Sequence, residues 1–249
     1  MKTLRLGPVR LRPHHPTVIA PFTDRTPLRV LERAAKEGLS LAEARVDLFR
    51  DRTPDAVRAH IEAVRAVLPV LVTVRAAREG GAWRDGEAAR LALYRALLPV
   101  ADAIDVELAA PIRADVVRAA RRARRLVVLS HHDFERTPAA AALGRIVTQG
   151  TRARADIVKI AAHVADDADA ARLAALFARH AESALVVVGM GEHGKKTRVF
   201  FPALGSLFTF ASLDHATAPG QLAWPEMCRE LSLFFPDYAP RPKRRRAKR

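Results

Sequence analysis

The chain has 249 residues, 49% of them hydrophobic, which is enough for one large core, and its formal net charge at pH 7 is +15. Its single cysteine, Cys228, excludes an internal disulfide and a thiolate metal cluster. The basic start at 1–16 lacks the apolar segment of a secretory signal, and no apolar run approaches the roughly 18 residues that a membrane helix needs. We therefore expect a protein of the reducing cytoplasm that has no membrane partner.

The positive charge is unevenly distributed along the chain. Seven of the 15 net charges come from the last nine residues, 241–249, which leaves eight for residues 1–240. We expect 1–240 to form the folded domain and 241–249 to be a basic, disordered tail. Such a tail can bind nucleic acid or another polyanion, but the body has few aromatic residues and no nucleic-acid-binding motif, so nucleic acid is not an expected partner.

Apolar segments of strand type alternate with segments of helix type along the body of the chain. Strands are predicted at 17–22, 41–49, 69–75, 103–108, 125–130, 155–161, 184–188 and 206–211. Helices are predicted at 28–37, 53–67 (capped by Thr53), 87–98, 113–124, 143–151, 169–180 and 225–234, and the helical pattern is weakest at 191–205.

This alternation favours a parallel sheet, and eight units in about 220 residues predict a closed (β/α)8 TIM barrel in a single domain. A doubly wound open sheet is the alternative. It usually has a glycine-rich turn after its first strand, and residues 21–24 are not such a turn.

Polar residues and a methionine lie at or just beyond the carboxyl ends of different predicted strands: Arg75, Glu107, His132, Lys159 and Met190. Active sites of TIM barrels are built at that end of the barrel. Charges scattered over the surface would not collect there, so we predict an active site from these positions.

Lys159 lies in the middle of the apolar strand predicted at 155–161. Burial disfavours its ammonium form unless the charge is paired, and a neutral amine can attack a carbonyl to form a Schiff base. Nearby arginines at the same end of the barrel would act in the same direction by repulsion. A lysine on an edge strand, or one with its head in water, is the alternative.

Two further patterns concern side-chain direction. In a strand at 41–49, Glu43, Arg45 and Asp47 share one face, which indicates a polar pocket or, equally well, an amphipathic edge strand. His131 and His132 are adjacent at a strand end, and only one of them can face the barrel axis because successive side chains alternate.

Six stretches in order resemble those of the type I 3-dehydroquinate dehydratase family, over about 18–226. They are 43–47 (EARVD), 73–81 (TVR through EGG), 104–108 (IDVEL), 130–138 (SHHDFERTP), 156–161 (DIVKIA) and 218–221 (APGQ). The resemblance implies a hydro-lyase of the shikimate pathway, and so of aromatic amino acid biosynthesis. The enzyme would convert 3-dehydroquinate to 3-dehydroshikimate without metal or diffusible cofactor.

The resemblance also implies roles for residues. Lys159 would form the imine with the C3 ketone, His132 would be the general base, and Glu79 would orient and polarise His132. Substrate contacts are implied for Glu43, Arg45, Arg75, Met190, Arg198, Thr217 and Gln221, with Arg198 on the carboxylate and the last two on a closing loop. A homodimer is a further expectation, although the sequence does not set the oligomeric state.

The chain departs from the family pattern at Pro21 and Thr217, where serine is usual, and at Ala44, where a bulky aromatic residue is usual. These departures bear on substrate affinity rather than on the chemistry. Asp105 and Glu107 fit a buried supporting network and a direct role equally well. The histidines outside the motifs have no spacing typical of a metal site.

Two other functions stay open at this stage. A class I aldolase-like lyase would also use a barrel lysine and would need a phosphate site near the last strands, for which 191–196 could be mistaken. A non-catalytic relative would bind polyanions through the tail 241–249, and salt-sensitive binding without turnover would identify it.

Overall fold

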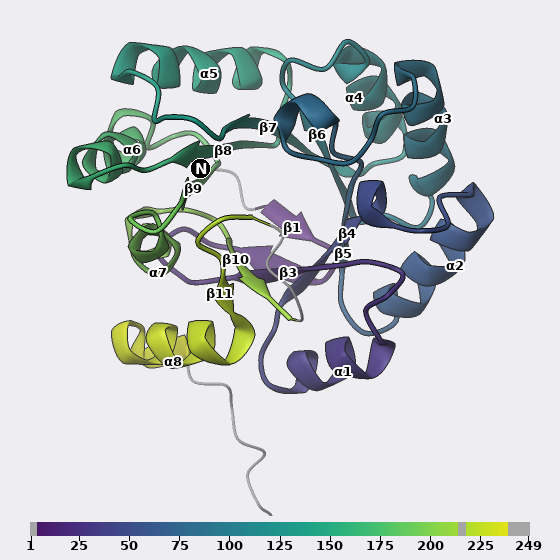
Figure 1. Cartoon of the computed structure of the whole chain (residues 1–249), viewed down its shortest axis with the longest axis horizontal. Helices are drawn as coiled ribbons and strands as arrows, with labels where there is room; N and C mark the ends of the chain where they lie inside the picture. Colours follow the sequence, from purple (N-terminus) through teal and green to yellow (C-terminus); the bar gives the residue numbers. More distant parts are fainter. Residues whose placement is uncertain (1–3, 214–217, 239–249) are drawn as a thin grey trace, which may run out of the picture.

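The computed structural model describes residues 4–213 and 218–238, and it forms a ring of strands surrounded by helices (Figure 1). Eight parallel strands make the ring: β3 (Val18–Phe22), β4 (Leu41–Arg45), β5 (Val70–Thr73), β6 (Ala103–Glu107), β7 (Leu126–Asp133), β8 (Ile157–His163), β9 (Leu185–Met190) and β10 (Thr209–Ser212). The predicted (β/α)8 barrel is therefore confirmed.

The ring closes between its first and last strands. β10 pairs in parallel with β3, with Thr209 opposite Val18, and a short parallel strand, β11 (Leu222–Ala223), lies beyond β10. On the other side, the backbone N–H of Leu207 donates to the carbonyl of Leu185 at 2.9 Å.

Helices cover the outside of the ring, with their apolar faces against the strands. They are α1 (Leu28–Lys36), α2 (Pro54–Arg65), α3 (Glu87–Leu97), α4 (Arg113–Arg122), α5 (Ala140–Arg152), α6 (Asp167–Arg179), α7 (Lys195–Leu204) and α8 (Trp224–Phe234). α7 occupies the region where the helical pattern was weakest, and Pro202 lies inside it. None of the helices in the described residues is long and apolar enough to cross a membrane.

Two local predictions were wrong. The strand expected at 41–49 ends at Arg45, and Val46–Leu48 form a 3-10 turn, so Asp47 is not on the strand face with Glu43. Thr53 precedes α2, but its hydroxyl donates to Asp51 at 2.7 Å and does not cap the helix. At Asp47 side-chain hydrogen bonds accompany a turn where apolar spacing indicated strand, and at Thr53, which stands at the N-cap position, only the capping bond is missing.

An antiparallel hairpin that was not predicted fills the amino-terminal end of the barrel. It consists of β1 (Leu4–Leu6) and β2 (Val9–Leu11), joined through Gly7 at φ 57°. Each strand has only three residues with an arginine in the middle, so its apolar signal is short. Leu6 and Leu11 are buried against inward-facing residues at the strand starts. The hairpin closes this end, which leaves the carboxyl end as the open one.

The described residues form one barrel, and the assignment of 1–240 as a catalytic domain stays a prediction. The predicted basic tail at 241–249 lies outside the described residues.

Candidate active site

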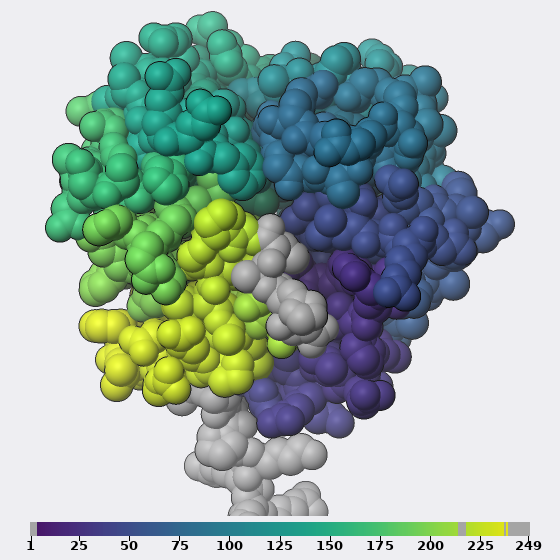
Figure 2. Space-filling model, in the orientation of Figure 1, coloured from purple at the N-terminus to yellow at the C-terminus, as the bar shows by residue number. Residues whose placement is uncertain are grey.

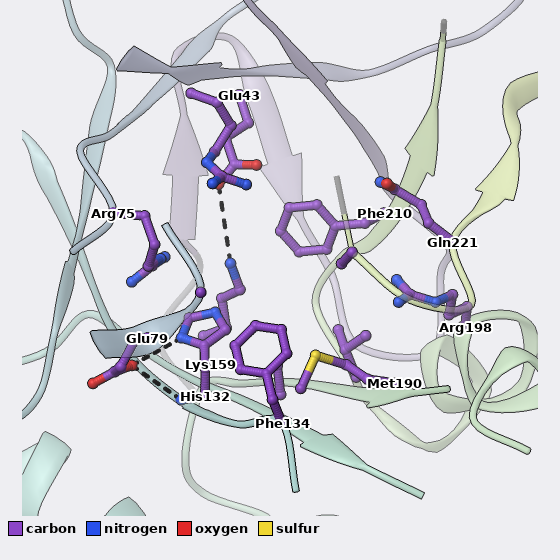
Figure 3. Close-up of a pocket in the computed structure, with 15 residues that line it drawn as sticks. Glu43, Arg75, Glu79, His132, Phe134, Lys159, Met190, Arg198, Phe210 and Gln221 are labelled. Atoms are coloured by element: carbon purple, nitrogen blue, oxygen red, sulfur yellow. Dashed lines mark hydrogen bonds and ion pairs between the residues drawn. The ribbon is translucent and has the colours of Figure 1, made fainter. Parts of the chain in front are cut away.

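One pocket lies at the carboxyl end of the strands, and Figure 3 shows its side chains converging from different strands and loops. Its lining comprises Glu43, Arg45, Arg75, Glu79, Gly80, His132, Phe134, Lys159, Ala161, Val188, Met190, Arg198, Phe210, Ala218 and Gln221. The predicted site residues are in this set except Glu107, which does not line the pocket, and Thr217, which lies outside the described residues. The fold thus brings together residues that the sequence separates by most of the chain.

Lys159 points from β8 into this pocket and is only 5% exposed. Its Nζ lies 3.2 Å from Oδ2 of Asp105 and 4.0 Å from Oε1 of Glu43. It also lies 4.4 Å from the ring centroid of Phe210, as a cation–π contact. A network of Asp105 with Lys159 was one of the two possibilities that the sequence left open, whereas the approach of Glu43 to Lys159 was not predicted. The Nζ of Lys159 thus lies beside two carboxylates, and attack on a carbonyl requires its neutral amine form.

Asp105 connects Lys159 to the neighbouring strands. Its Oδ1 accepts hydrogen bonds from Nη2 of Arg75 at 2.8 Å and from Oγ of Ser130 at 2.6 Å. Burial alone would raise the pKa of Asp105, but the charges of Arg75 and Lys159 and the hydrogen bonds outweigh it and hold the pKa at about 2. Asp105 is thus a permanent anion that fixes the position of the Lys159 amine.

Glu107, the other acid of β6, has a supporting place. Its Oε2 accepts from Nη2 of Arg90 at 2.7 Å, and its Oε1 accepts from the backbone N–H of Ala76 at 2.8 Å. It does not line the pocket. Of the two readings left open by the sequence, these contacts favour structural support.

Arg75 lies in the pocket wall with its guanidinium already engaged. Nη1 donates to Oγ of Ser130 at 2.7 Å and lies 3.3 Å from Oε1 of Glu107, while Nη2 holds Asp105. Burial would lower the pKa of Arg75, but these carboxylates raise it, so the group stays charged. In this geometry Arg75 holds the carboxylates of Asp105 and Glu107 in place.

Arg45 is held in a similar way by an acid of the neighbouring turn. Its Nε and Nη2 donate to the two carboxylate oxygens of Asp47 at 3.0 and 2.8 Å. Asp47 also accepts the backbone N–H of Ala82 at 3.1 Å. Asp47 therefore links Arg45 to the glycine-containing loop that follows Glu79.

His132 and Glu79 form a close pair (Figure 3). Oε2 of Glu79 lies 3.0 Å from Nδ1 of His132 and also 3.0 Å from its backbone nitrogen. Burial raises the pKa of Glu79 to about 7, and burial, with the positive charges of Arg75, Lys159 and Arg45, lowers the pKa of His132 well below 6.5. The pair is therefore a neutral imidazole beside a carboxyl group that titrates near neutrality.

The tautomer of His132 follows from this contact. Above the pKa of Glu79 its carboxylate accepts the Nδ1–H, which leaves the lone pair on Nε2 free. The Nε2 atom is then the basic atom of the ring. Such an imidazole can take a proton from a carbon acid and later return it.

Arg198 enters the pocket from α7 and differs from the other arginines there. It is 1% exposed, its Nη2 donates to the carbonyl of Pro219 at 3.0 Å, and its buried Nε has no hydrogen-bond partner in the described part of the protein. No described acid pairs with it, and burial lowers its pKa to about 10. A buried cation without a counter-ion is suited to an anionic ligand group.

Two aromatic residues of the pocket were not predicted. Phe134 lies parallel to the ring of His132, with 6.3 Å between centroids and 17° between planes. Phe210 faces Lys159 from β10. Strand alternation was the available signal, because Phe134 is two residues after His132 and shares its side of the chain.

Gly80 explains the close approach of Phe134. Its φ is 76°, and an added Cβ would come within 2.2 Å of the Phe134 ring. The turn Ala77–Glu79 thus ends in a residue that allows both the left-handed backbone and the ring on top of it. Gly80 and Phe134 together wall the pocket beside His132.

The two adjacent histidines face opposite ways. His132 lines the pocket of Lys159, whereas His131 lines a hollow on the outside of the barrel. This agrees with the expected alternation. Among the described residues, no group of three His, Cys, Asp or Glu side chains could hold a metal ion.

Comparison with protein families gives a match over nearly the whole barrel. The model of the family described as type I 3-dehydroquinase matches residues 19–237. The chain is 36% identical to the 3-dehydroquinate dehydratase of Methanosarcina barkeri over 228 residues, which cover 87% of this chain and 94% of that protein. It is also 36% identical to the 3-dehydroquinate dehydratase of Methanothermobacter thermautotrophicus, covering 82% and 91% of the two chains.

The fold has the same relatives. The crystal structure of 3-dehydroquinate dehydratase from Geobacillus kaustophilus superposes with a TM-score of 0.86 at 30% identity, covering 94% of this chain and 96% of that one. The barrel, its order of elements and its length are therefore shared with that enzyme.

Proposed function

Because the chain belongs to the type I 3-dehydroquinase family, we propose that it eliminates water from 3-dehydroquinate through an imine on Lys159. The product is 3-dehydroshikimate, and the pathway is the shikimate pathway of aromatic biosynthesis. The observation that carries this proposal is the convergence of Lys159, His132 and Arg198 in one pocket, where no described carboxylate pairs with Arg198. The direct test is turnover of 3-dehydroquinate, followed at the absorbance of the conjugated product, and its absence would reject the proposal.

The first step joins substrate and protein. The neutral amine of Lys159 attacks the C3 ketone, and loss of water leaves an iminium ion. The carboxylate of Asp105 lies 3.2 Å from Nζ, so it can stabilise the positive charge of both the ammonium and the iminium. The iminium draws electrons from the adjacent C2–H bond, which makes that proton acidic.

The second step is the elimination. Nε2 of His132 takes the C2 proton, the electron pair forms the enamine, and the enamine expels the C1 hydroxyl as His132 protonates it. Hydrolysis of the conjugated imine then frees the product and Lys159. Glu79 keeps the Nδ1 proton in place throughout, because its carboxylate lies 3.0 Å from Nδ1.

Substrate capture depends on Arg198. Since its buried guanidinium has no acid partner in the described residues, Arg198→Ala should remove the charge that receives the substrate carboxylate. We expect KM to rise strongly and kcat/KM to fall. The fall should correspond to a loss of roughly 2–5 kcal/mol of transition-state stabilisation. Steady-state kinetics test this, with Arg95→Ala on the exposed face of α3 as the control. An unchanged KM in Arg198→Ala would reject the assignment.

The pH dependence should follow Glu79. Its pKa is raised to about 7, and only its ionised form accepts the Nδ1–H of His132 and leaves Nε2 basic. We therefore expect kcat/KM to fall as the pH drops below about 7. Glu79→Gln cannot ionise, so the variant should be slower by about tenfold or more and should lack this acidic limb. The same limb in wild type and variant would assign it to another group.

The free energy of unfolding should also depend on the ionisation of Glu79, but it should decrease as the pH rises, whereas kcat/KM decreases as the pH falls. Because the folded-state pKa of Glu79 lies above its ordinary value, the folded protein binds this proton more tightly than the unfolded chain does. Its contribution to the free energy of unfolding is present below the ordinary pKa and is lost as the pH rises to about 7. Glu79→Gln lacks this loss, so its Tm should improve relative to wild type as the pH rises. A constant Tm difference would contradict the raised pKa.

A further inference from the structure

A groove on the outside of the barrel is lined by several arginines. It runs along α5, and two hollows that share His131, Ile146 and Gln149 make up its length. We call it the α5 groove. Its described lining contains one acid, Asp133, and five arginines: Arg113, Arg136, Arg145, Arg152 and Arg172. It lies on the side of β7 away from the pocket of Lys159, because His131 faces it and His132 does not.

The charge of this region is out of proportion to its size. Residues 111–156, which contain α4, β7 and α5, have ten arginines, four acids and no lysine, a net charge of +6. Residues 1–240 carry +8 in total, so less than a fifth of that length holds three quarters of its net charge. The segment forms the top of the molecule in the view of Figures 1 and 2. Concave surfaces of one sign focus a strong potential.

The arginines of α5 are the ones best placed to bind a ligand. Arg145 and Arg152 are exposed, and neither has a hydrogen-bond or ion-pair partner in the described part of the chain. They are seven residues apart, so they lie on one face of the helix about 10 Å from each other. Arg136 adds an exposed guanidinium, and its nearest described carboxylate, that of Asp133, is 3.9 Å away.

The shape and composition of the α5 groove narrow the class of ligand. Guanidinium groups match phosphate oxygens with paired hydrogen bonds and are weakly hydrated. The arginines are spread along a helix of 13 residues, about 20 Å, which fits an extended anion better than a compact one. The lining has no Trp, Tyr or Phe to anchor a protein partner, and a concave surface does not lie flat on a membrane.

We propose that the α5 groove binds a single strand of nucleic acid through its phosphodiester backbone, without reading base sequence. Binding through the phosphates alone needs a line of cations but neither a sequence motif nor aromatic side chains that stack on bases, so the lack of both does not speak against it. The sequence had suggested the tail as the only polyanion site. The folded barrel supplies a second one, made of residues from three helices and a loop, and this proposal does not rest on the proposed enzyme activity.

The test measures how salt weakens binding of labelled oligo(dT) and oligo(U), each of roughly 15 nucleotides, to the full chain. Fluorescence anisotropy between about 50 and 200 mM salt gives the slope of log K against log salt. The double substitution Arg145→Gln/Arg152→Gln should reduce the steepness of that slope by about 1.4, or 0.7 for each arginine. Comparison of the DNA and RNA probes tells which strand is preferred.

A matched control removes two positive charges elsewhere. Arg29→Gln/Lys36→Gln acts on exposed residues of α1, at the opposite side of the barrel in Figure 1, and should leave the slope unchanged. Both double variants should keep wild-type Tm, because the changed side chains are exposed. Both double variants should also be measured in a second background, in which the basic residues of 241–249 are replaced by glutamine.

The outcomes are distinct. A smaller slope in the groove variant alone, seen with and without the tail charges, supports the α5 groove. The proposal is overturned if neither probe binds at low salt, if the α1 control weakens binding equally, or if the groove effect disappears once the tail is neutral. Displacement of the strand by low pyrophosphate at constant ionic strength would indicate a compact-anion site and would also overturn it.

Discussion

Lys159→Ala is expected to lose at least about 10⁴-fold in kcat, the order of loss seen when a catalytic nucleophile is removed. No other lysine is among the residues that line the pocket, so nothing there can form the imine in its place. The variant should still fold, because Asp105 keeps its contacts with Arg75 and Ser130 when Lys159 is gone. Its Tm and its binding of substrate separate loss of chemistry from loss of structure.

Trapping gives the sharper form of this experiment. Borohydride added with 3-dehydroquinate should reduce the imine to a stable amine and inactivate the wild type irreversibly. Peptide mass mapping should place the adduct on Lys159. Lys195 is partly exposed and pairs with Glu192, Lys196 is exposed and pairs with Asp167, and neither lines the pocket, so they serve as internal controls. Full turnover by Lys159→Ala, or an adduct on either control lysine, would show that the Schiff-base assignment is wrong.

The second large effect separates two neighbouring histidines. His132→Ala should lose about 10²-fold or more in kcat, the contribution of a well-placed general base. His131→Ala should lose little, because His131 faces the outside of the barrel. The two variants remove the same side chain from consecutive positions of β7, so each controls for the local effect of the other. The reverse ranking would contradict the role given to His132.

The pH profile of His132→Ala gives a second test of the pair that His132 forms with Glu79. Glu79 would lose its ring partner in His132→Ala, and a buried acid whose pKa is already near 7 would be free to take up a proton. The pH profile of His132→Ala should therefore lack the limb assigned to Glu79. A profile like that of the wild type would mean that the residual rate still uses another base.

The barrel was predictable because its elements repeat one physical pattern. Each buried parallel strand is an apolar run, and each helix between two strands has one apolar face. The exceptions are short. The hairpin of β1 and β2 has six strand residues in all, and the 3-10 turn at Val46–Leu48 is fixed by hydrogen bonds of Asp47. Patterns of apolar spacing cannot detect elements that contain so few apolar residues.

The positions of the site residues were predictable, but the sequence did not decide which acid of β6 pairs with Lys159. The carboxyl end of each parallel strand faces the same mouth, so Lys159 and His132 were expected to meet there. The contact of Lys159 with Asp105 joins β8 to β6, which are not neighbours in the sheet. Such a contact depends on barrel width and side-chain reach, and neither can be read from the alternation of residues.

The same limit applies to the α5 groove. Its arginines come from α4, α5, α6 and the loop after β7. In the sequence, the arginines of each helix look like those of an ordinary solvent-exposed helix face. The sequence shows that residues 111–156 are basic, but only the packing of the helices shows that their guanidinium groups surround one concave surface. By contrast, the charge of 241–249 is visible in the sequence because it is contiguous.

The closure of the ring has a consequence for how the protein is made. β3 is synthesised early, but its partner β10 is among the last strands to appear, with Thr209 opposite Val18. Until then a nascent chain has an open sheet edge at β3 as well as one at its growing end, and such edges pair readily with other chains. Phe210 reaches Lys159 only through the same late pairing. A chain that stops before β10 would thus combine an incomplete site with a surface prone to aggregation, which makes premature termination costly and early binding by chaperones advantageous.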